Sequence, residues 1–245
     1  LTFTSGLINT GSNELKVRYT CTSRTVGYTS SKYVNGNLRR SVSGSGSYFF
    51  PVGTALNYEL ANVNLSTTAG VSNILVQFID STPLIPSLPL SNINVQGLAT
   101  DSLLNYGFWR LTPNSALTSG SYTFTGTEIG QTNSINANST YALLRRSNSS
   151  LSWTSTGTHN PNTQVYSAGA VTAVRSSLNV FGDFSISFVD FVSFTGSSLI
   201  SGVAGQANAV YLFPSIIPGV DSWVTIVSLD GGATLNSIDD NSTGY

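Results

Sequence analysis

The side chains best suited to nucleophilic chemistry are one histidine and one cysteine. His159, the single histidine, lies in TGTHNPN, a Gly/Asn/Pro run that favours a turn. A Ser-His-Asp or Cys-His site needs a histidine beside a nucleophile, and Cys21, the single cysteine, has no evident partner. We therefore expect His159 to hydrogen-bond backbone groups in a turn, Cys21 to be a small buried filler, and the chain to contain no catalytic residues.

Oxygen-bearing side chains near the C-terminus have the chemistry that calcium prefers. Carboxylate and amide oxygens are hard ligands, and four such residues occur here, namely Asp230, Asp239, Asp240 and Asn241. The same residue types also form Asx-turns, and their spacing matches no EF-hand loop. Two interpretations therefore remain, a calcium site and a set of turns, and we expect no other cofactor. A zinc site is not predicted, because one histidine and one cysteine supply too few ligands.

Paired carboxylates could perform glycosidic chemistry, because any two of the eleven acidic residues can converge in space. Most of the acids lie beside aromatic residues in strand-like runs, without a glycine-rich loop. Asp183 in FGDF and Asp190 in FVDF are examples. This context favours structural roles for them.

The three tryptophans could form an aromatic platform on which sugars stack. Trp109 and Trp153 alternate with apolar neighbours, which favours packing in the core. Trp223 follows Asp221 and Ser222 and is the more open position. It is the candidate ligand-binding residue.

Composition predicts an all-β protein with a neutral surface. Charged residues make up 9% of 245 residues, the net charge is −1, and Met is absent, whereas Thr, Val, Tyr and Phe are common. No cluster of basic residues exceeds a pair such as Arg39-Arg40, so we expect no nucleic-acid partner, because neutralising many phosphates takes a basic stripe. No apolar run approaches the roughly 20 residues of a membrane helix, so we expect no membrane insertion.

The pattern along the chain predicts three parts. Residues 1–45 contain short runs with polar corners, typical of a β-solenoid end or a capping hairpin. Residues 46–190 contain longer aromatic strands at sandwich spacing, and 191–245 begin a second, incomplete β module. We place the bend at Gly44 to Gly46. The lack of an initiator Met predicts that the chain is a piece of a longer protein.

Five motifs in order resemble a module of giant secreted, adhesin-like surface proteins of the Bacteroidota. They are YVNGNLRRSV, YFFPVGT, YGFWRLTP, YALLRRSNSSLSW with GTH, and FGDFSIS. The resemblance covers roughly residues 1–190 and implies a solenoid rung followed by a β-sandwich, with Tyr48 to Gly53 at the junction. It also implies export by type IX secretion and a location at the cell surface.

The resemblance further implies a glycan site. Asp101-Ser102-Leu103 is similar to the O-glycosylation pattern of that phylum, which makes Ser102 the candidate carrier.

The function expected from the sequence is that of a non-enzymatic extracellular adhesin or stalk fragment. Its expected partners are polysaccharides or cell-surface polymers, and neighbouring modules or copies of the same chain. Two alternatives remain, a carbohydrate-binding module of a larger secreted enzyme and a subunit of an extracellular filament.

Overall fold

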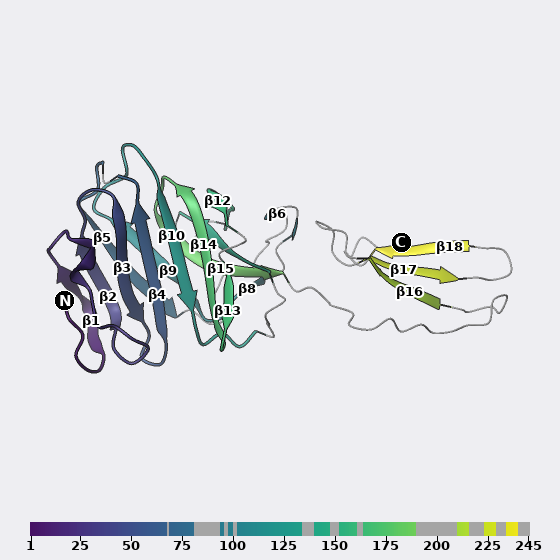
Figure 1. The fold of residues 1–245 in the computed structure, drawn as a ribbon, viewed down its shortest axis with the longest axis horizontal. Helices are drawn as coiled ribbons and strands as arrows, with labels where there is room; N and C mark the ends of the chain where they lie inside the picture. Colours follow the sequence, from purple (N-terminus) through teal and green to yellow (C-terminus); the bar gives the residue numbers. More distant parts are fainter. Residues whose placement is uncertain are drawn as a thin grey trace. The chain divides into compact units, whose positions relative to one another are not determined.

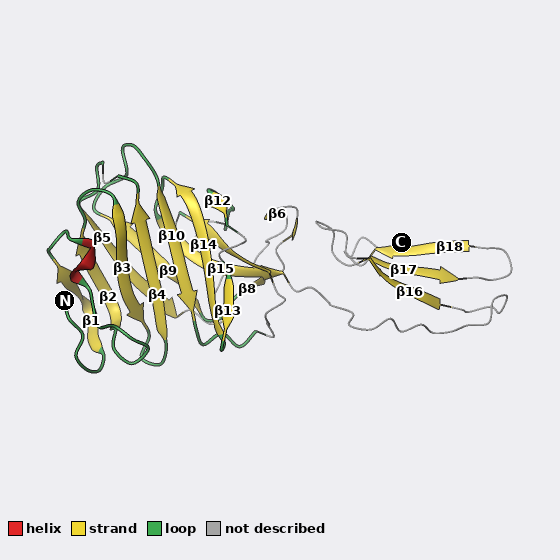
Figure 2. Cartoon of the chain, in the orientation of Figure 1, coloured by secondary structure: helices red, strands yellow, loops and turns green. Residues whose placement is uncertain are grey.

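The computed structural model describes eleven stretches of the chain: 1–67, 69–80, 94–95, 98–99, 102–133, 140–147, 152–160, 164–189, 210–215, 223–228 and 234–239. Strands dominate them, and the one helical segment among them is the short 3-10 turn η1, Thr22–Arg24 (Figure 2). The predicted all-β class is therefore confirmed. The strands are β1 Ile8–Val17, β2 Val34–Ser41, β3 Gly46–Gly53, β4 Tyr58–Leu65, β5 Asn73–Asp80, β6 Asn94–Val95, β7 Leu98–Ala99, β8 Ser102–Leu103, β9 Gly107–Pro113, β10 Tyr122–Glu128, β11 Thr140–Arg146, β12 Thr158–His159, β13 Val165–Ser167, β14 Ala170–Leu178, β15 Gly182–Val189, β16 Val210–Ser215, β17 Trp223–Ser228 and β18 Thr234–Asp239.

The chain divides into two compact units. The first comprises Leu1–Val95 and Thr100–Val189, and the second comprises Gln96–Ala99 and Asp190–Tyr245. In the second unit β17 pairs with β16 on one side and with β18 on the other.

The first unit is built on one curled, open sheet. Its strand order is β11-β15-β9-β5-β2-β3-β4-β10-β14-β12, with β1, β13 and β8 paired beside this path. Strands β3, β4, β10 and β14 lie side by side in one limb, and β5, β9 and β15 pass behind them (Figure 1). The limbs meet at β2, which pairs with β3 at Val34 and Asn35 and with β5 from Leu38 to Ser41.

Strand β2 lies just before the expected boundary at residue 45. Strand β2 lies inside the sheet path rather than in a separate cap, because its two halves pair with the two different limbs. The turn at residues 42–45 does contain a bend, since Gly44 has a φ of +82°, which favours glycine.

Strand β3 runs without interruption through Pro51, which lies within the Tyr48 to Gly53 motif. Pro51 lies opposite Leu60 of β4, and on its other side β3 is paired only at Val52 and Gly53. A proline is tolerated here because that side of β3 has no ladder hydrogen bond at Pro51 to lose.

Period-2 alternation determines which faces of the strands are buried. In β4, Glu59, Ala61, Val63 and Leu65 are buried, while the residues between them are half-buried or exposed. The strands β5 and β10 show the same pattern. Each limb therefore presents an apolar face to the space between the limbs.

The core between the limbs is rich in aromatic rings. Trp109 of β9 is fully buried and packs edge-on against Phe124 of β10, with 5.8 Å between ring centroids. Phe124 in turn lies 4.5 Å from the ring of Phe184 on β15. Gly126 makes room for the indole, because a Cβ there would lie 2.7 Å from Cζ3 of Trp109. The two limbs are thus joined by direct ring contacts.

Candidate functional site

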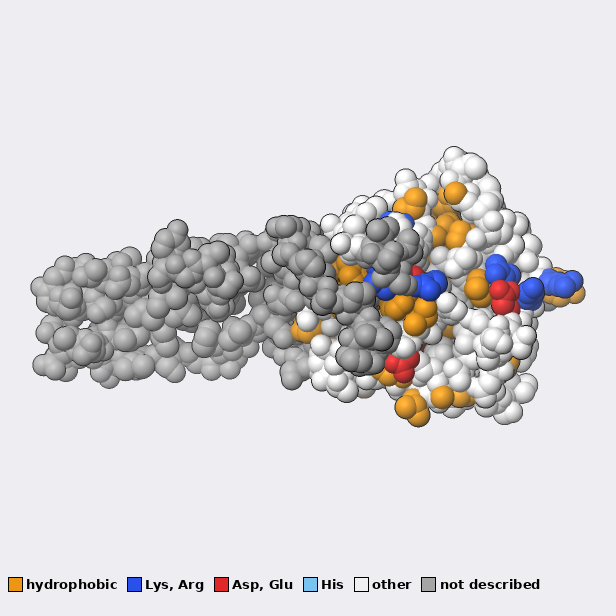
Figure 3. Space-filling model, turned by 180° about the vertical axis from the view of Figure 1, so that it is seen from behind, with side chains coloured by type: hydrophobic (Ala, Val, Ile, Leu, Met, Phe, Trp, Pro, Cys, Tyr) orange, Lys and Arg blue, Asp and Glu red, His pale blue; other side chains and the backbone are white. Residues whose placement is uncertain are grey.

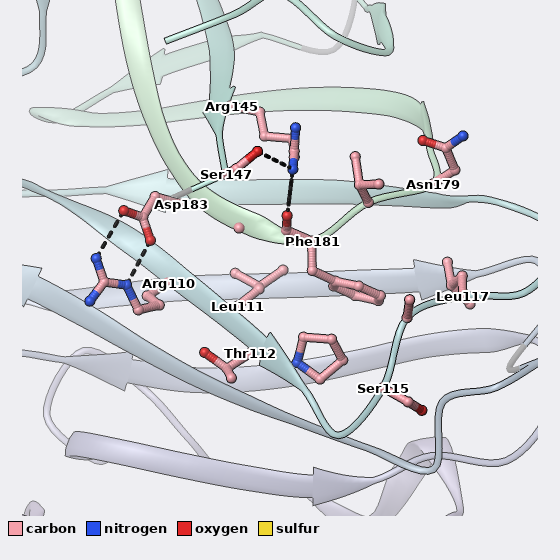
Figure 4. Close-up of a pocket in the computed structure, with 14 residues that line it drawn as sticks. Arg110, Leu111, Thr112, Ser115, Leu117, Arg145, Ser147, Asn179, Phe181 and Asp183 are labelled. Atoms are coloured by element: carbon pink, nitrogen blue, oxygen red, sulfur yellow. Dashed lines mark hydrogen bonds and ion pairs between the residues drawn. The ribbon is translucent and has the colours of Figure 1, made fainter. Parts of the chain in front are cut away.

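A groove of about 830 Å³ lies at one end of the curled sheet. The β9–β10 loop, the β14–β15 turn and the end of β11 contribute its walls (Figure 4). Leu111 and Phe181 supply apolar surface, whereas Thr112, Ser115 and Asn179 supply neutral polar groups. The groove combines the two kinds of surface that a sugar presents, apolar C–H faces and hydroxyl groups.

A row of three charged residues crosses the strands at one wall. Asp183 of β15 is the register partner of Arg110 on β9 and of Arg146 on β11. Arg110 donates to both carboxylate oxygens at 2.7 and 2.9 Å, as Figure 4 shows, and Arg146 donates to Oδ2 at 3.1 Å. Asp183 is 1% exposed, so its carboxylate is enclosed by the two guanidiniums.

Arg146 is held in place by aromatic rings as well as by Asp183. Its guanidinium lies 4.8 Å from the ring centroid of Phe108 and 4.4 Å from that of Trp153. Burial lowers the pKa of Arg146, and the charge of Asp183 opposes that effect. The pKa of Arg110 is raised, chiefly by its hydrogen bond to Asp183. Both guanidiniums therefore remain cationic around neutral pH.

Arg145 adds a positive charge to the groove without a carboxylate partner among the described residues. It donates to the carbonyl oxygen of Phe181 at 2.7 and 3.2 Å and to Oγ of Ser147 at 3.3 Å. Of the three arginines in this region, Arg110 and Arg146 pair with Asp183, whereas Arg145 binds Phe181 and Ser147.

A second cluster with chemical potential is a pair of buried glutamates. Glu59 of β4 and Glu128 of β10 are both 0% exposed, and both lie directly beyond the Thr127–Leu60 pair at one end of the β4–β10 pairing. Burial raises the pKa of both carboxyls well above the usual value, and the Glu128 charge raises that of Glu59 further.

The hydrogen-bond partners of these two carboxyls offset only part of the effect of burial on their pKa values. Glu59 accepts a hydrogen bond from the amide of Ile129 at 2.8 Å. The amides of Tyr106 and Gly107 oppose part of the pKa rise of Glu128, but neither of its oxygens has a partner of normal hydrogen-bond geometry among the described residues. The pair has the residue types of an acid–base dyad, and both side chains are fully buried.

Two of the residues that the sequence singled out for ligand or metal binding, Trp223 and Asp239, lie within the described residues. Trp223 begins β17 and lies opposite Asp239, the last residue of β18. Asp230, Asp240 and Asn241 lie outside the described residues. Within the part of the chain that is described, no group of three or more acidic, histidine or cysteine side chains is placed to hold a metal ion.

Ser102, the expected glycan carrier, begins β8 opposite Phe188 of β15 and is half-buried. Asp101, the first residue of its motif, lies outside the described residues.

The structure describes both residues considered for nucleophilic chemistry, His159 and Cys21. His159 lies in the short strand β12, and its Nε2 is 2.8 Å from Nε2 of Gln164. Burial, with the charge of Arg175, lowers the pKa of His159 to about 4, so it is neutral at pH 7. Cys21 is exposed, which corrects the expected buried filler. It precedes η1, where its carbonyl accepts a hydrogen bond from the buried Arg40.

Sequence reasoning missed both the groove and the glutamate pair. The groove is lined by segments that lie about 30 or more positions apart in the sequence, and no local sequence pattern predicts it. The pair did leave a trace, because Glu59 is in phase with Ala61 and Val63, and Glu128 is in phase with Phe124 and Gly126. A charged residue on the apolar phase of a strand indicates a buried charge.

The described residues include no helix long and apolar enough to cross a membrane. Comparison with protein-family models, curated proteins and solved structures found no match to this chain.

Proposed function

We propose that this chain is a non-enzymatic extracellular surface module that acts in adhesion or display. The groove is the observation that carries the proposal. Three separate segments of a rigid sheet form it, and it offers hydroxyl, amide, apolar and guanidinium groups, but it contains no carboxylate apart from the enclosed Asp183. Such a lining suits the binding of a hydroxyl-rich polymer and provides no acid–base pair to cleave it.

The neutral surface supports the same function. On the face drawn in Figure 3, charged groups occupy a few small areas among neutral polar side chains and backbone. Neutral hydroxyls and amides make many weak hydrogen bonds, and repetition of such a module along a long chain would convert weak contacts into avidity.

The finer architecture belongs to the same proposal. We propose that the facing limbs of the curled sheet act as a β-sandwich, and that the parallel pairing of β1 with β2 across η1 acts as a solenoid rung. Both features are those implied by the resemblance to secreted surface proteins of the Bacteroidota. A carbohydrate-binding module attached to an enzyme is the second candidate, because the same groove would serve it.

Capture of polymers by the immobilised chain tests the proposal. Beads that carry the purified protein are expected to retain cells or at least one polysaccharide from a panel. Ala116→Trp places a bulky ring on an exposed position of the groove wall and should reduce retention about tenfold. Ala55→Trp is the matched control, since Ala55 is equally exposed and does not line the groove.

The remaining variants separate binding from catalysis. Cys21→Ser and His159→Ala should leave retention unchanged, provided that circular dichroism shows each variant to be folded. Retention that is equal in Ala116→Trp and Ala55→Trp would remove the groove from the function. Failure of the unaltered chain to retain any polymer or cell would remove the function itself.

A further inference from the structure

We infer that Phe181 is the stacking platform of the groove, and that the groove binds a polysaccharide of neutral sugars whose rings carry C–H groups on their faces. This inference rests on the proposed function and specifies its ligand. Phe181 lines the groove, and contacts to its ring and to its backbone both hold it in place. A β-linked glucan is a polysaccharide of this kind, because its ring hydroxyls are equatorial and its axial C–H groups lie on both faces of each sugar.

The ring of Phe181 is held from one side by a second ring. It stacks on the ring of Tyr122, with 4.6 Å between the centroids and 9° between the planes. Tyr122 is 1% exposed, and its hydroxyl donates to the carbonyl of Val180 at 2.8 Å. The supporting ring is therefore bound to the same turn that carries Phe181. Because Tyr122 covers one face of the Phe181 ring, Phe181 lines the groove with its other face and its edge.

The backbone of Phe181 is fixed as well. Arg145 donates two hydrogen bonds to the carbonyl oxygen of Phe181, at 2.7 and 3.2 Å. The next residue, Gly182, begins β15 opposite Leu111 of β9. In Figure 4 the Phe181 side chain points from the β14–β15 turn toward the β9–β10 loop, which carries Leu117. A ring that is already fixed loses little conformational entropy on binding, and this favours stacking of a ligand.

The groove around Phe181 offers what the rest of a sugar ring needs. Pro113 and Leu117 are half-buried and add apolar surface to the lining. Ser115 and Asn179 are exposed on the lining and offer a hydroxyl and an amide to sugar hydroxyls. A mainly apolar site with a few polar groups is the usual composition of a small-ligand pocket.

The charged groups of the groove bind other groups of the protein. Asp183 is 1% exposed and accepts hydrogen bonds from Arg110 and Arg146, while Arg145 donates to the Phe181 carbonyl. A neutral sugar can bind beside these groups without breaking their contacts. We therefore expect ring stacking and hydroxyl contacts, rather than charge, to determine which polysaccharide binds.

Substitution of the ring tests the inference on the full chain. Phe181→Leu keeps an apolar side chain but removes the flat face, whereas Phe181→Tyr keeps that face. Tyr166→Leu is the matched control. Tyr166 is also half-buried and stacks on a buried tyrosine, Tyr141, at 6.3 Å and 12°, but it does not line the groove.

The probes are cellohexaose, a soluble β-linked glucan, and hexagalacturonate, which carries a carboxylate on each sugar. Their Kd values are measured by titration calorimetry, and circular dichroism checks that each variant is folded. Cellohexaose binds more tightly than hexagalacturonate, and Phe181→Leu weakens its Kd about 3- to 10-fold. Phe181→Tyr and Tyr166→Leu stay within about twofold. Raising the salt concentration from about 0.05 to 0.5 M also leaves the Kd of cellohexaose within about twofold, because the ligand is neutral.

Three outcomes would overturn the inference. Unchanged cellohexaose affinity in Phe181→Leu would show that an apolar side chain suffices and that no ring stacks. Equal losses in Phe181→Leu and Tyr166→Leu would show a general loss of packing. Absent cellohexaose binding, or tighter binding of hexagalacturonate, would show that the groove does not select a neutral glucan. In each case, retention of cells or of another polysaccharide by the immobilised chain would leave the proposed adhesive function standing, whereas loss of all retention would remove that function itself.

Discussion

At the scale of single residues, the buried glutamates have the clearest consequence for stability. Glu59 and Glu128 have raised pKa values in the folded protein, chiefly because of burial. A raised carboxyl pKa means that the folded state binds protons more tightly than the unfolded chain. Its stabilising effect is fully present below the unfolded pKa of about 4.3 and is lost as pH rises toward the folded pKa.

We therefore predict that the free energy of unfolding falls as pH rises above about 4.3, and that Glu128→Gln removes much of this fall. The amide keeps the shape of the protonated acid and carries no charge. At pH 7 we expect Glu128→Gln to stabilise the protein by about 1 to 3 kcal/mol, measured by urea unfolding across pH.

The contrast for that measurement is Glu14→Gln. Glu14 pairs with Arg39 at 2.8 Å, and its hydrogen bond to Arg39 lowers the pKa of Glu14. The sign is therefore opposite, and loss of this carboxylate should destabilise the protein at neutral pH, by about 0 to 1 kcal/mol because the pair is partly exposed. Destabilisation by Glu128→Gln at pH 7 would show that the buried carboxyl is ionised and paired.

At the scale of strands, the contact of β9 with β10 depends on glycine at position 126, because the Trp109 indole occupies the space that a side chain there would need. A Cβ at Gly126 would lie 2.7 Å from Cζ3 and 2.8 Å from Cη2 of Trp109. We predict that Gly126→Ala lowers the free energy of unfolding by about 1 to 3 kcal/mol, because the indole is fixed between the limbs. Thr125→Ala on the same strand points away from the core and should stay within about 0.5 kcal/mol. Equal effects of the two substitutions in thermal unfolding would place Trp109 elsewhere.

A second prediction at this scale concerns the two ends of the sheet. Arg175 of β14 is 1% exposed and donates to the carbonyl of Leu143 on β11, and to the carbonyl of Ser155 at 2.7 Å. It therefore joins β14 to β11 where no strand pairing does so. Arg175→Met should destabilise the protein by about 2 to 4 kcal/mol, since buried carbonyls lose their donor.

Hydrogen exchange distinguishes this role from a general packing loss. In Arg175→Met, amides of β11 should exchange faster, while those of β3 and β4, in the middle of the other limb, keep their protection relative to global stability. Uniform acceleration across all strands would contradict a local clamp at the seam.

At the scale of the whole molecule, composition and alternation predicted the all-β class and most of the strands between residues 46 and 189. They did not predict that β2 pairs with strands of both limbs. This pairing is a long-range property, and the local sequence VNGNLRRS does not indicate it. The exposure of the Cys21 side chain was also missed. Arg40 binds the backbone carbonyl of Cys21 rather than its side chain, so this contact does not depend on the residue type.

The groove shows the same limit most clearly. Arg110, Arg145 and Asp183 come from three different strands, and only cross-strand register brings them to one place. The structure pairs Arg146 with Asp183 and buries the side chains of both Arg145 and Arg146. Ring contacts and buried hydrogen bonds, rather than local propensity, decide that outcome.

The length of the polysaccharide recovered from the immobilised chain tests the central claim, binding without turnover, most directly. Size-exclusion chromatography of polymer retained for a day should give the profile of untreated polymer, because the groove holds no acid–base pair and the buried glutamates face no substrate. Shortened polymer in the recovered fraction, absent when Glu59→Gln or Glu128→Gln is immobilised instead, would show that this chain is an enzyme and contradict the account.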